Sequence, residues 1–361
     1  MLKKPRFWIG VLVSVLALIL AFRKVDLRDM WAEWAGANYW LLVASVPLLL
    51  LFLILRAYRW RLLFYPQQGL RVRNLFAVIN IGYLISNILP ARLGDVARAY
   101  LIGDTEAVSR TSAFSTVVAE RVLDALCAVA GFFLVLPFAP VPGWMVRSGL
   151  VVGVVALAAI VIFLVLVRRR DWTLRLIDRI LSSLHWPDGE TVSRFWARLG
   201  GRTHLRFLSR LPWLDRLRLG RMAGSLIDGL SGVTTLRQGP RLLLFSVAIW
   251  TVISAFYWIV LLAFDAAQPP VVGLAVSSVT ALGMTVPSSP GFIGVFEWLT
   301  RETLGLFGMA PEPALSYAFA AHLIVYVLYT LLGVIGMQQQ NLTISEVQRR
   351  ISTPSEADTP T

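Results

Sequence analysis

The sequence predicts an all-α polytopic membrane protein with about six full spans and two re-entrant hairpins, arranged as an inverted repeat. Eight simple spans are the alternative. Three observations predict this class. First, 57% of the 361 residues are hydrophobic, 15% are charged, and the mean hydropathy is +0.68. Second, continuous apolar runs repeatedly approach the roughly 20 residues that a helix needs to cross a bilayer, whereas a transmembrane barrel shows weaker alternating segments. Third, proline and glycine interrupt two of the apolar stretches.

The full spans are the uninterrupted apolar runs. The first resembles a signal peptide, but Phe22-Arg23-Lys24 stands where the small residues of a cleavage site belong, so we expect it to stay uncleaved. An aromatic cluster typical of a membrane interface precedes the second span: Trp31, Trp34, Tyr39 and Trp40. The six predicted spans are residues 7–22, 40–55, 112–136, 148–167, 242–264 and 314–337.

Arginines near the span ends set the predicted orientation, because Lys and Arg collect on the cytoplasmic side of membranes. The loop after the second span is therefore cytoplasmic, and so is the N-terminus. The arginines of that loop are Arg56, Arg59, Arg61, Arg71 and Arg73. Arg168, Arg169 and Arg170 mark a second cytoplasmic span end. Two spans lie between residue 101 and these arginines, so the chain must leave residues 75–101 on the cytoplasmic side. The broken stretch also follows a cytoplasmic loop, and it therefore both starts and ends on the cytoplasmic side.

The first break is the tip of the first predicted hairpin. Proline removes a backbone donor and glycine frees the chain in the run Pro90-Ala91-Arg92-Leu93-Gly94-Asp95. Irregular backbone at membrane depth is tolerated only inside protein or around a wet cavity. Residues 271–306 contain a second break, with the same four-residue step from Pro287 to Gly291. The glycines and prolines assigned to the two breaks are Pro90, Gly94, Pro287, Pro290, Gly291 and Gly294.

The paired breaks predict an inverted repeat, since each follows two spans and precedes one. The first repeat covers residues 1–138 and the second covers 148–337, within a transmembrane domain of residues 1–337. Paired interrupted segments are the best sequence indication of a transporter binding site at the repeat interface. Residues 168–240 are a basic insertion whose amphipathic patches we expect on the anionic lipid surface. Residues 338–361 are predicted to be a disordered cytoplasmic tail.

Ionisable residues within predicted spans are costly to insert, at about 2.5 to 3.5 kcal/mol each, so they must pair or face water. Glu120 and Asp124 share a helix face and would repel unless a cation such as Arg92, Arg98 or Arg121 lies between them. We therefore predict a buried cluster that joins the first break to this span. The residues assigned to a charge network or to proton coupling are Asp95, Glu120, Arg121, Asp124 and Glu297. The alternative is that these charges only hold the fold together.

Other polar residues leave alternatives open. Glu297 has Arg301 one turn later, so a helix-surface pair is the simpler interpretation. His322 is either a packing histidine or a proton relay. Cys127 lies in an apolar run and reads as a buried, inert thiol. No metal site or cofactor is expected, and the net charge of +13 lies in short loops, so no nucleic-acid partner is needed.

Three motifs together resemble the lysylphosphatidylglycerol synthase transmembrane-region family of flippase-like membrane proteins. They are Asn87-x-x-Pro90-x-Arg92-x-Gly94-Asp95-x-x-Arg98, Glu120-Arg121-x-x-Asp124 and Pro287-x-Ser289-Pro290-Gly291-x-x-Gly294-x-x-Glu297. Asp95 stands where the family usually has Glu, and Phe292 where it often has glycine. Members that make aminoacylated lipid carry a soluble catalytic domain after the membrane region, whereas a tail follows Met337 here. The resemblance therefore implies the lipid-translocating part without the synthase.

The predicted function is transport of a membrane lipid with a polar, anionic headgroup between the leaflets of a bacterial inner membrane. Substrate binding is assigned to four residues: Arg92, Arg98, Asn87 and Ser289. The sequence contains no ATPase motif, so transport would be downhill or ion-coupled. The alternative is a membrane enzyme that transfers a sugar to or from a polyprenyl-phosphate-type carrier. A structural or regulatory membrane protein is a third class, and a homo-oligomer is left open.

Overall fold

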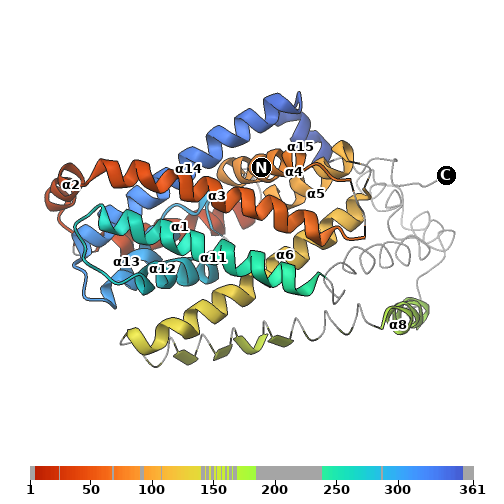
Figure 1. Ribbon diagram of the computed structural model, residues 1–361, viewed down its shortest axis with the longest axis horizontal. Coiled ribbons are helices and arrows are strands. Elements are labelled where there is room, and N and C mark those ends of the chain that lie inside the picture. Colours follow the sequence, from red (N-terminus) through yellow and green to blue (C-terminus); the bar gives the residue numbers. More distant parts are fainter. Residues whose placement is uncertain are drawn as a thin grey trace, which may run out of the picture.

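The computed structural model describes residues 5–23, 25–66, 69–89, 93–106, 108–139, 169–183, 238–285 and 288–352, with scattered positions between 143 and 165. In these residues every regular element is a helix (Figure 1). The longer helices are α1 (Pro5–Phe22), α2 (Leu27–Gly36), α3 (Tyr39–Leu63), α4 (Val72–Ile88), α5 (Leu93–Thr105), α6 (Arg110–Val135), α8 (Arg170–Ser183), α11 (Gly239–Leu262), α12 (Val271–Gly283), α13 (Val295–Gly305), α14 (Pro311–Gln339) and α15 (Ile344–Ser352). Two short 3₁₀ helices are η1 (Leu136–Phe138) and η4 (Pro290–Phe292).

Four of the described helices are long and apolar enough to cross a membrane: α3, α6 continued through η1, α11 and α14. They coincide with four of the six predicted spans. Their outer faces carry apolar side chains that are more than half exposed, such as Leu243, Leu244 and Leu331, which suits contact with lipid chains. The chain is thus an all-α polytopic membrane protein. Helix α1 matches the span predicted at 7–22, and most of the span predicted at 148–167 lies outside the described residues.

Each interrupted stretch forms two short helices that pack against each other, α4 with α5 and α12 with α13. The longest of the four, α4, has 17 residues and is about 26 Å long, short of the roughly 30 Å hydrocarbon core. In the first pair, a methyl group on Gly94 would overlap the carbonyl oxygen of Gly82, so glycine is required for this close approach. Pro90 and Arg92, at the tip of the first break, and Pro287 in the second lie outside the described residues.

Four helix contacts within the first half recur within the second half. In the first half α3 packs on α4, α4 on α5, α5 on α6 and α3 on α6; in the second half α11, α12, α13 and α14 repeat these four contacts. Across the halves, α4 packs on α14 just as α12 packs on α6, while α3 and α11 pack along each other. Figure 1 shows α3 and α11 side by side, with α14 and α6 on opposite sides of them in this view. The same set of helix contacts therefore occurs in both halves of the chain.

Small residues set the spacing at the junction of α14 with the first hairpin. A methyl group on Gly336 would come within 2.9 Å of the carbonyl oxygen of Ala77, and one on Gly333 would overlap Leu84. Helices in membranes use such residues to bring their backbones together, because hydrophobicity alone does not drive their association. The last helix of the second half is therefore fixed tightly to the hairpin of the first half.

Two predicted boundaries need correction. The second span was predicted to end at residue 55, with Arg56 and Arg59 in a cytoplasmic loop, but α3 continues to Leu63 and buries both arginines. The prediction of a disordered tail does not hold for residues 344–352, which form α15. Thr343 and Glu346 cap its start reciprocally, and Val347 is 2% exposed against the core. Residues 353–361 lie outside the described residues, as does most of 168–240 apart from the amphipathic helix α8.

Candidate functional site

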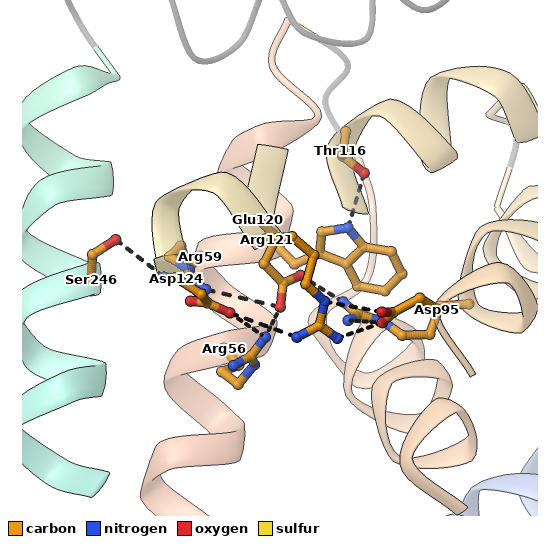
Figure 2. A network of polar contacts seen from close by, with 10 residues as sticks. Arg56, Arg59, Asp95, Thr116, Glu120, Arg121, Asp124 and Ser246 are labelled. Atoms are coloured by element: carbon orange, nitrogen blue, oxygen red, sulfur yellow. Dashed lines mark hydrogen bonds and ion pairs between the residues drawn. The ribbon is translucent and has the colours of Figure 1, made fainter. Parts of the chain in front are cut away.

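Seven charged side chains from three helices form one connected network, which we call the arginine cluster (Figure 2). Helix α3 contributes two of them, α5 contributes two, and α6 contributes three. The members are Arg56, Arg59, Asp95, Arg98, Glu120, Arg121 and Asp124. The cluster thus joins the first hairpin to both of the long helices beside it.

Glu120 lies at the centre of the cluster and is 1% exposed. Its Oε2 accepts a hydrogen bond from Nη2 of Arg98 at 2.7 Å, and its Oε1 accepts one from Nη2 of Arg56. Nη2 of Arg59 lies 3.9 Å from Oε1. Three guanidinium groups therefore compensate the charge of one buried carboxylate.

Asp124 lies one turn after Glu120 and shares its partners on α3. Nη2 of Arg59 donates to Oδ1 at 2.5 Å, and Nη2 of Arg56 donates to Oδ2 at 3.0 Å. Nη1 of Arg59 reaches across to the hydroxyl of Ser246 on α11 at 3.2 Å. The repulsion expected between Glu120 and Asp124 is thus relieved by two arginines that sequence reasoning had placed in a loop.

Asp95 and Arg121 tie the start of α5 to α6. Nε and Nη2 of Arg121 donate to the two carboxylate oxygens of Asp95 at 3.0 and 2.5 Å, which is a bidentate pair. Asp95 stands in the first turn of α5, where a negative charge also suits the helix dipole. This contact fixes the helix that leaves the first break.

The arginine cluster has more positive than negative charge, with four arginines against three carboxylates. Arg98 is 2% exposed, and its guanidinium stacks 4.3 Å above the ring of Trp60. Its Nε and Nη1 atoms have no hydrogen-bond partner in the described structure. Nη1 lies 3.8 Å from Oδ1 of Asp95, which is an ion-pair distance without a hydrogen bond. Buried donors without acceptors are costly, and a guanidinium N–H suits a phosphate or carboxylate oxygen. Arg98 thus has two buried donor atoms without a hydrogen-bond acceptor among the described residues, whereas Arg56 and Arg59 have one each.

The second break is held by a different pair. Oε1 of Glu297 lies 2.5 Å from Nδ1 of His322 on α14, and its Oε2 accepts from the backbone N–H of Gly294 at 2.6 Å. The pairing of Glu297 with Arg301 does not form, because Arg301 donates to the carbonyl oxygens of Leu20 and Arg23 at 2.7 and 3.0 Å. Glu297 therefore connects the second hairpin to the last span.

The two pairs occupy equivalent places in the two repeats. Arg121 and His322 each lie eleven positions after the first residue of their helix, and Asp95 and Glu297 each lie two positions after theirs. In both halves an acid at the start of the second hairpin helix is thus bound to a base on the following long helix. The two bases differ in chemistry, since one is arginine and the other histidine.

The two breaks approach each other beside α14. Nδ2 of Asn87, near the end of α4, donates to the hydroxyl of Thr330 at 3.2 Å and lies 3.4 Å from the carbonyl oxygen of Tyr326. A methyl group on Gly291 would come within 2.8 Å of the Tyr326 ring and 3.9 Å of the Asn87 carbonyl oxygen. Segments about 200 residues apart in sequence thus meet at one turn of the last span.

Helix α1 closes the other side of the second break. The backbone N–H of Ser289 donates to the hydroxyl of Ser14 at 2.9 Å, and Gly10 faces the carbonyl oxygen of Ser288. Phe292 has a φ of 60°, which places it in the left-handed region beside Gly291 with a φ of 69°. That conformation favours glycine, so the phenylalanine at position 292 departs from the preference of its backbone.

The structure brings most of the predicted site residues into two groups. Asp95, Arg98, Glu120, Arg121 and Asp124 lie in the arginine cluster, while Asn87, Ser289 and Glu297 lie around the second break and α14. Arg92 lies outside the described residues, so its prediction as a ligand stays a prediction.

Sequence reasoning missed Arg56 and Arg59. Their spacing of three residues, their aromatic neighbours Tyr58 and Trp60, and the lack of a helix breaker before Pro66 are the signals that could have extended the span. Across the described part of the chain, no three His, Cys, Asp or Glu side chains gather in a way that could hold a metal ion. Cys127 is partly buried and unpaired with another cysteine.

Comparisons with known proteins place the chain among membrane proteins. A family model described as "Lysylphosphatidylglycerol synthase TM region" matches residues 7–333. The glycosyltransferase AglD of Haloferax volcanii is 26% identical over 93% of this chain and 54% of its own length. A UPF0104 membrane protein of Methanothermobacter thermautotrophicus is 24% identical over 94% of this chain and 95% of its own length, and one of Methanocaldococcus jannaschii is 25% identical over 45% and 51%. The chain spans about half the length of two of these relatives.

Proposed function

Because the chain belongs to the lysylphosphatidylglycerol synthase TM region family, we propose that it moves a lipid with a polar, anionic headgroup between membrane leaflets. In this proposal the chain lies in a bacterial inner membrane with both termini in the cytoplasm. The lipid headgroup passes between the two hairpins while its acyl chains stay in the bilayer.

The observation that carries the proposal is the incomplete pairing of Arg98. Its buried guanidinium donates to Glu120 through Nη2, while Nε and Nη1 have no hydrogen-bond acceptor in the described part of the chain and Nη1 lies 3.8 Å from Oδ1 of Asp95, in a cluster that has one positive charge in excess. A hydrogen bond from either donor to a headgroup phosphate would be charge-assisted, and the phosphate would neutralise the excess charge. A cluster that served only to hold the fold would be expected to balance its charges and donors.

The position of the cluster also supports movement. It lies against the first hairpin, whose tip follows Asn87, and Asn87 contacts the turn of α14 that holds the second hairpin. Interrupted helices at a repeat interface are the usual site of substrate binding in secondary transporters. Rocking of one half against the other would therefore expose the same site to each leaflet in turn.

The experiment is a flipping assay with purified protein in liposomes that contain fluorescent phosphatidylglycerol, a zwitterionic phosphatidylcholine, or a polyprenyl phosphate. An impermeant quencher reports how fast the label leaves the inner leaflet. We expect faster flipping of the anionic lipids, and a loss of about tenfold or more in Arg98→Gln, since a charge-assisted hydrogen bond contributes about 1.5–3 kcal/mol. Arg98→Lys keeps the charge but not the planar set of donors, so its flipping rate should lie between those of the wild type and Arg98→Gln.

Arg110→Gln is the matched control. Arg110 also stacks on an aromatic ring, 5.3 Å from that of Tyr100, and pairs with an acid, Asp104 at 2.8 Å, but it lies outside the cluster. The Arg110→Gln protein should flip lipid at the wild-type rate. Equal rates for Arg98→Gln and Arg110→Gln would remove Arg98 from the mechanism, and the absence of flipping for every lipid would refute the proposed transport.

A second candidate is an enzyme that acts on a lipid-linked sugar, because one relative is named a glycosyltransferase and is similar over 93% of this chain. The chain's carboxylates in the cluster are already bound by arginines, which leaves them poorly disposed to act as bases or to bind a divalent cation. Release of sugar from, or its transfer to, a polyprenyl phosphate by the purified protein would favour this candidate. Flipping of the same lipid with its sugar unchanged would favour transport.

A further inference from the structure

His322 binds the second break through both of its ring nitrogens. Nε2 lies 2.9 Å from the carbonyl oxygen of Gly291, and Nδ1 lies 2.5 Å from Oε1 of Glu297. Both side chains are shielded, with side-chain exposures of 12% for His322 and 2% for Glu297. One imidazole thus holds the break itself and the first turn of α13.

The geometry fixes the number of protons in this pair. A carbonyl oxygen can only accept, so Nε2 must carry a proton and donate it to Gly291. One further proton must lie between Nδ1 and Oε1, either on the imidazole beside an ionised glutamate or on Glu297 beside a neutral ring. Without that proton, a lone pair of Nδ1 would face a carboxylate oxygen at 2.5 Å. Loss of one proton therefore turns an attractive contact into a repulsive one.

His322 has one charged partner among the described residues. That partner is Glu297. The guanidinium of Arg301 on α13 is bonded instead to the carbonyl oxygens of Leu20 and Arg23 and pairs with Glu302 at 3.3 Å. The titratable neighbours are Tyr326 on α14, whose ring centroid is 6.3 Å from that of His322, and Tyr257 on α11, which packs on Phe296.

The groups that face this turn of α14 from α4 are neutral. They are the amide and the backbone carbonyl of Asn87, and the carbonyl lies 3.5 Å from the hydroxyl of Tyr326. A change in the protonation of His322 therefore occurs one helical turn from the contact between α14 and the end of α4. In the described structure, no charged side chain of the first hairpin contacts His322, so none can compensate for the loss of the proton.

The equivalent pair in the first repeat cannot respond in this way. Arg121 keeps its charge at any physiological pH, so its bidentate contact with Asp95 stays closed when the proton concentration changes. The two breaks are therefore held by pairs at the same positions, but only the pair with histidine depends on a proton.

We infer that the His322–Glu297 pair is a proton-binding site whose proton closes the second break, so that proton release opens one end of the lipid path. The inference rests on the proposed function, and in it a proton gradient is the energy source for lipid transport. Deprotonation separates Nδ1 from Glu297 and loosens the carbonyl of Gly291 and the start of α13. A proton gradient then sets which way the cycle runs.

The first test measures the proton site itself. The sequence has three histidines, so a His185→Gln, His204→Gln protein with ¹⁵N-labelled histidine reports on His322 alone. We expect Nε2 to stay protonated while the Nδ1 signal changes in one step as the pH is raised. The same protein with Glu297→Gln should show a neutral ring throughout the pH series. A ring that does not titrate, or that titrates identically with Glu297→Gln, overturns the inference.

The second test measures flipping in liposomes as the pH is varied. The wild-type rate should rise with pH, by about tenfold per unit on its steep limb if one proton controls it. Glu297→Gln keeps the shape of the pair and replaces the shared proton by an amide N–H that cannot be released. The second break should then stay closed, and the flipping rate should be low and independent of pH. Glu302→Gln removes an exposed carboxylate from the same helix, with a side-chain exposure of 53%, and should keep the wild-type profile.

The outcomes separate the two proposals. Flipping that is fast but equally fast at every pH, or a Glu297→Gln protein with the wild-type profile, overturns the proton site and leaves lipid transport standing. Absence of flipping in the wild type refutes transport, and the titration of the His322 ring then decides the proton site without any activity measurement.

Discussion

Replacing Glu120 by glutamine should destabilise the protein strongly while preserving the shape of the side chain. Glu120 is 1% exposed and compensates Arg56, Arg59 and Arg98, so its neutralisation raises the excess charge of the cluster from one to two. Leaving a buried charge without its partner costs about 3–5 kcal/mol, whereas an average hydrogen bond between membrane helices contributes about 0.6 kcal/mol. The charges decide the outcome, so we expect a loss of about 3–5 kcal/mol in the free energy of unfolding.

The measurement is unfolding of the purified protein from mild detergent into increasing SDS, followed by circular dichroism. Glu302→Gln is the matched control, because it makes the same change at an exposed carboxylate 3.3 Å from Arg301 and should cost less than about 1 kcal/mol. The double variant Glu120→Gln, Arg98→Gln restores the excess charge to one and should recover part of the loss. If Glu120→Gln costs no more than the control, the cluster is not an energetic unit, and the reasoning from its net charge fails.

Two further predictions concern the frame around the site. Gly94→Ala should lower stability by about 1–3 kcal/mol in the same SDS assay, since its methyl group meets the backbone of Gly82, whereas Gly305→Ala has open space and should not destabilise. Val347→Asp should release α15 from the core and speed tryptic cleavage within that helix by about tenfold or more; an unchanged cleavage rate would mean that Val347 does not hold α15 in place.

Much of the fold could be predicted because a bilayer admits few backbone solutions. Long apolar runs must be helices, and a proline and glycine break within such a run must lie inside protein. The breaks at Gly94 and Gly291 therefore located both hairpins, and the order of spans around them gave the repeat. The span ends were less well determined, because α3 and α15 continue through residues whose burial depends on partners far away in sequence.

The candidate site was predicted in part for the same reason. The intramembrane acids Glu120 and Asp124 require cations, but sequence alone could not say which ones, since charge counts treat every arginine near a span end as an orientation signal. The structure selects Arg56 and Arg59 because α3 packs against α6. The sequence also could not name the partner of Glu297, because one-turn spacing to Arg301 is visible in a sequence and a contact with His322 on another helix is not.

The two halves share a framework but differ in the charges they hold, and this difference bears on mechanism. If both breaks were held by equally permanent ion pairs, no signal would favour the opening of one side over the other. Here the first hairpin is held by guanidinium groups that keep their charge, in a cluster with one excess positive charge, while the second is held by the Glu297–His322 pair. In the two proposals, an anionic headgroup acts on the first arrangement and a proton on the second. The Asn87 contact with α14 places the two within reach of each other, so binding of one ligand can alter the affinity for the other by the same factor in both directions.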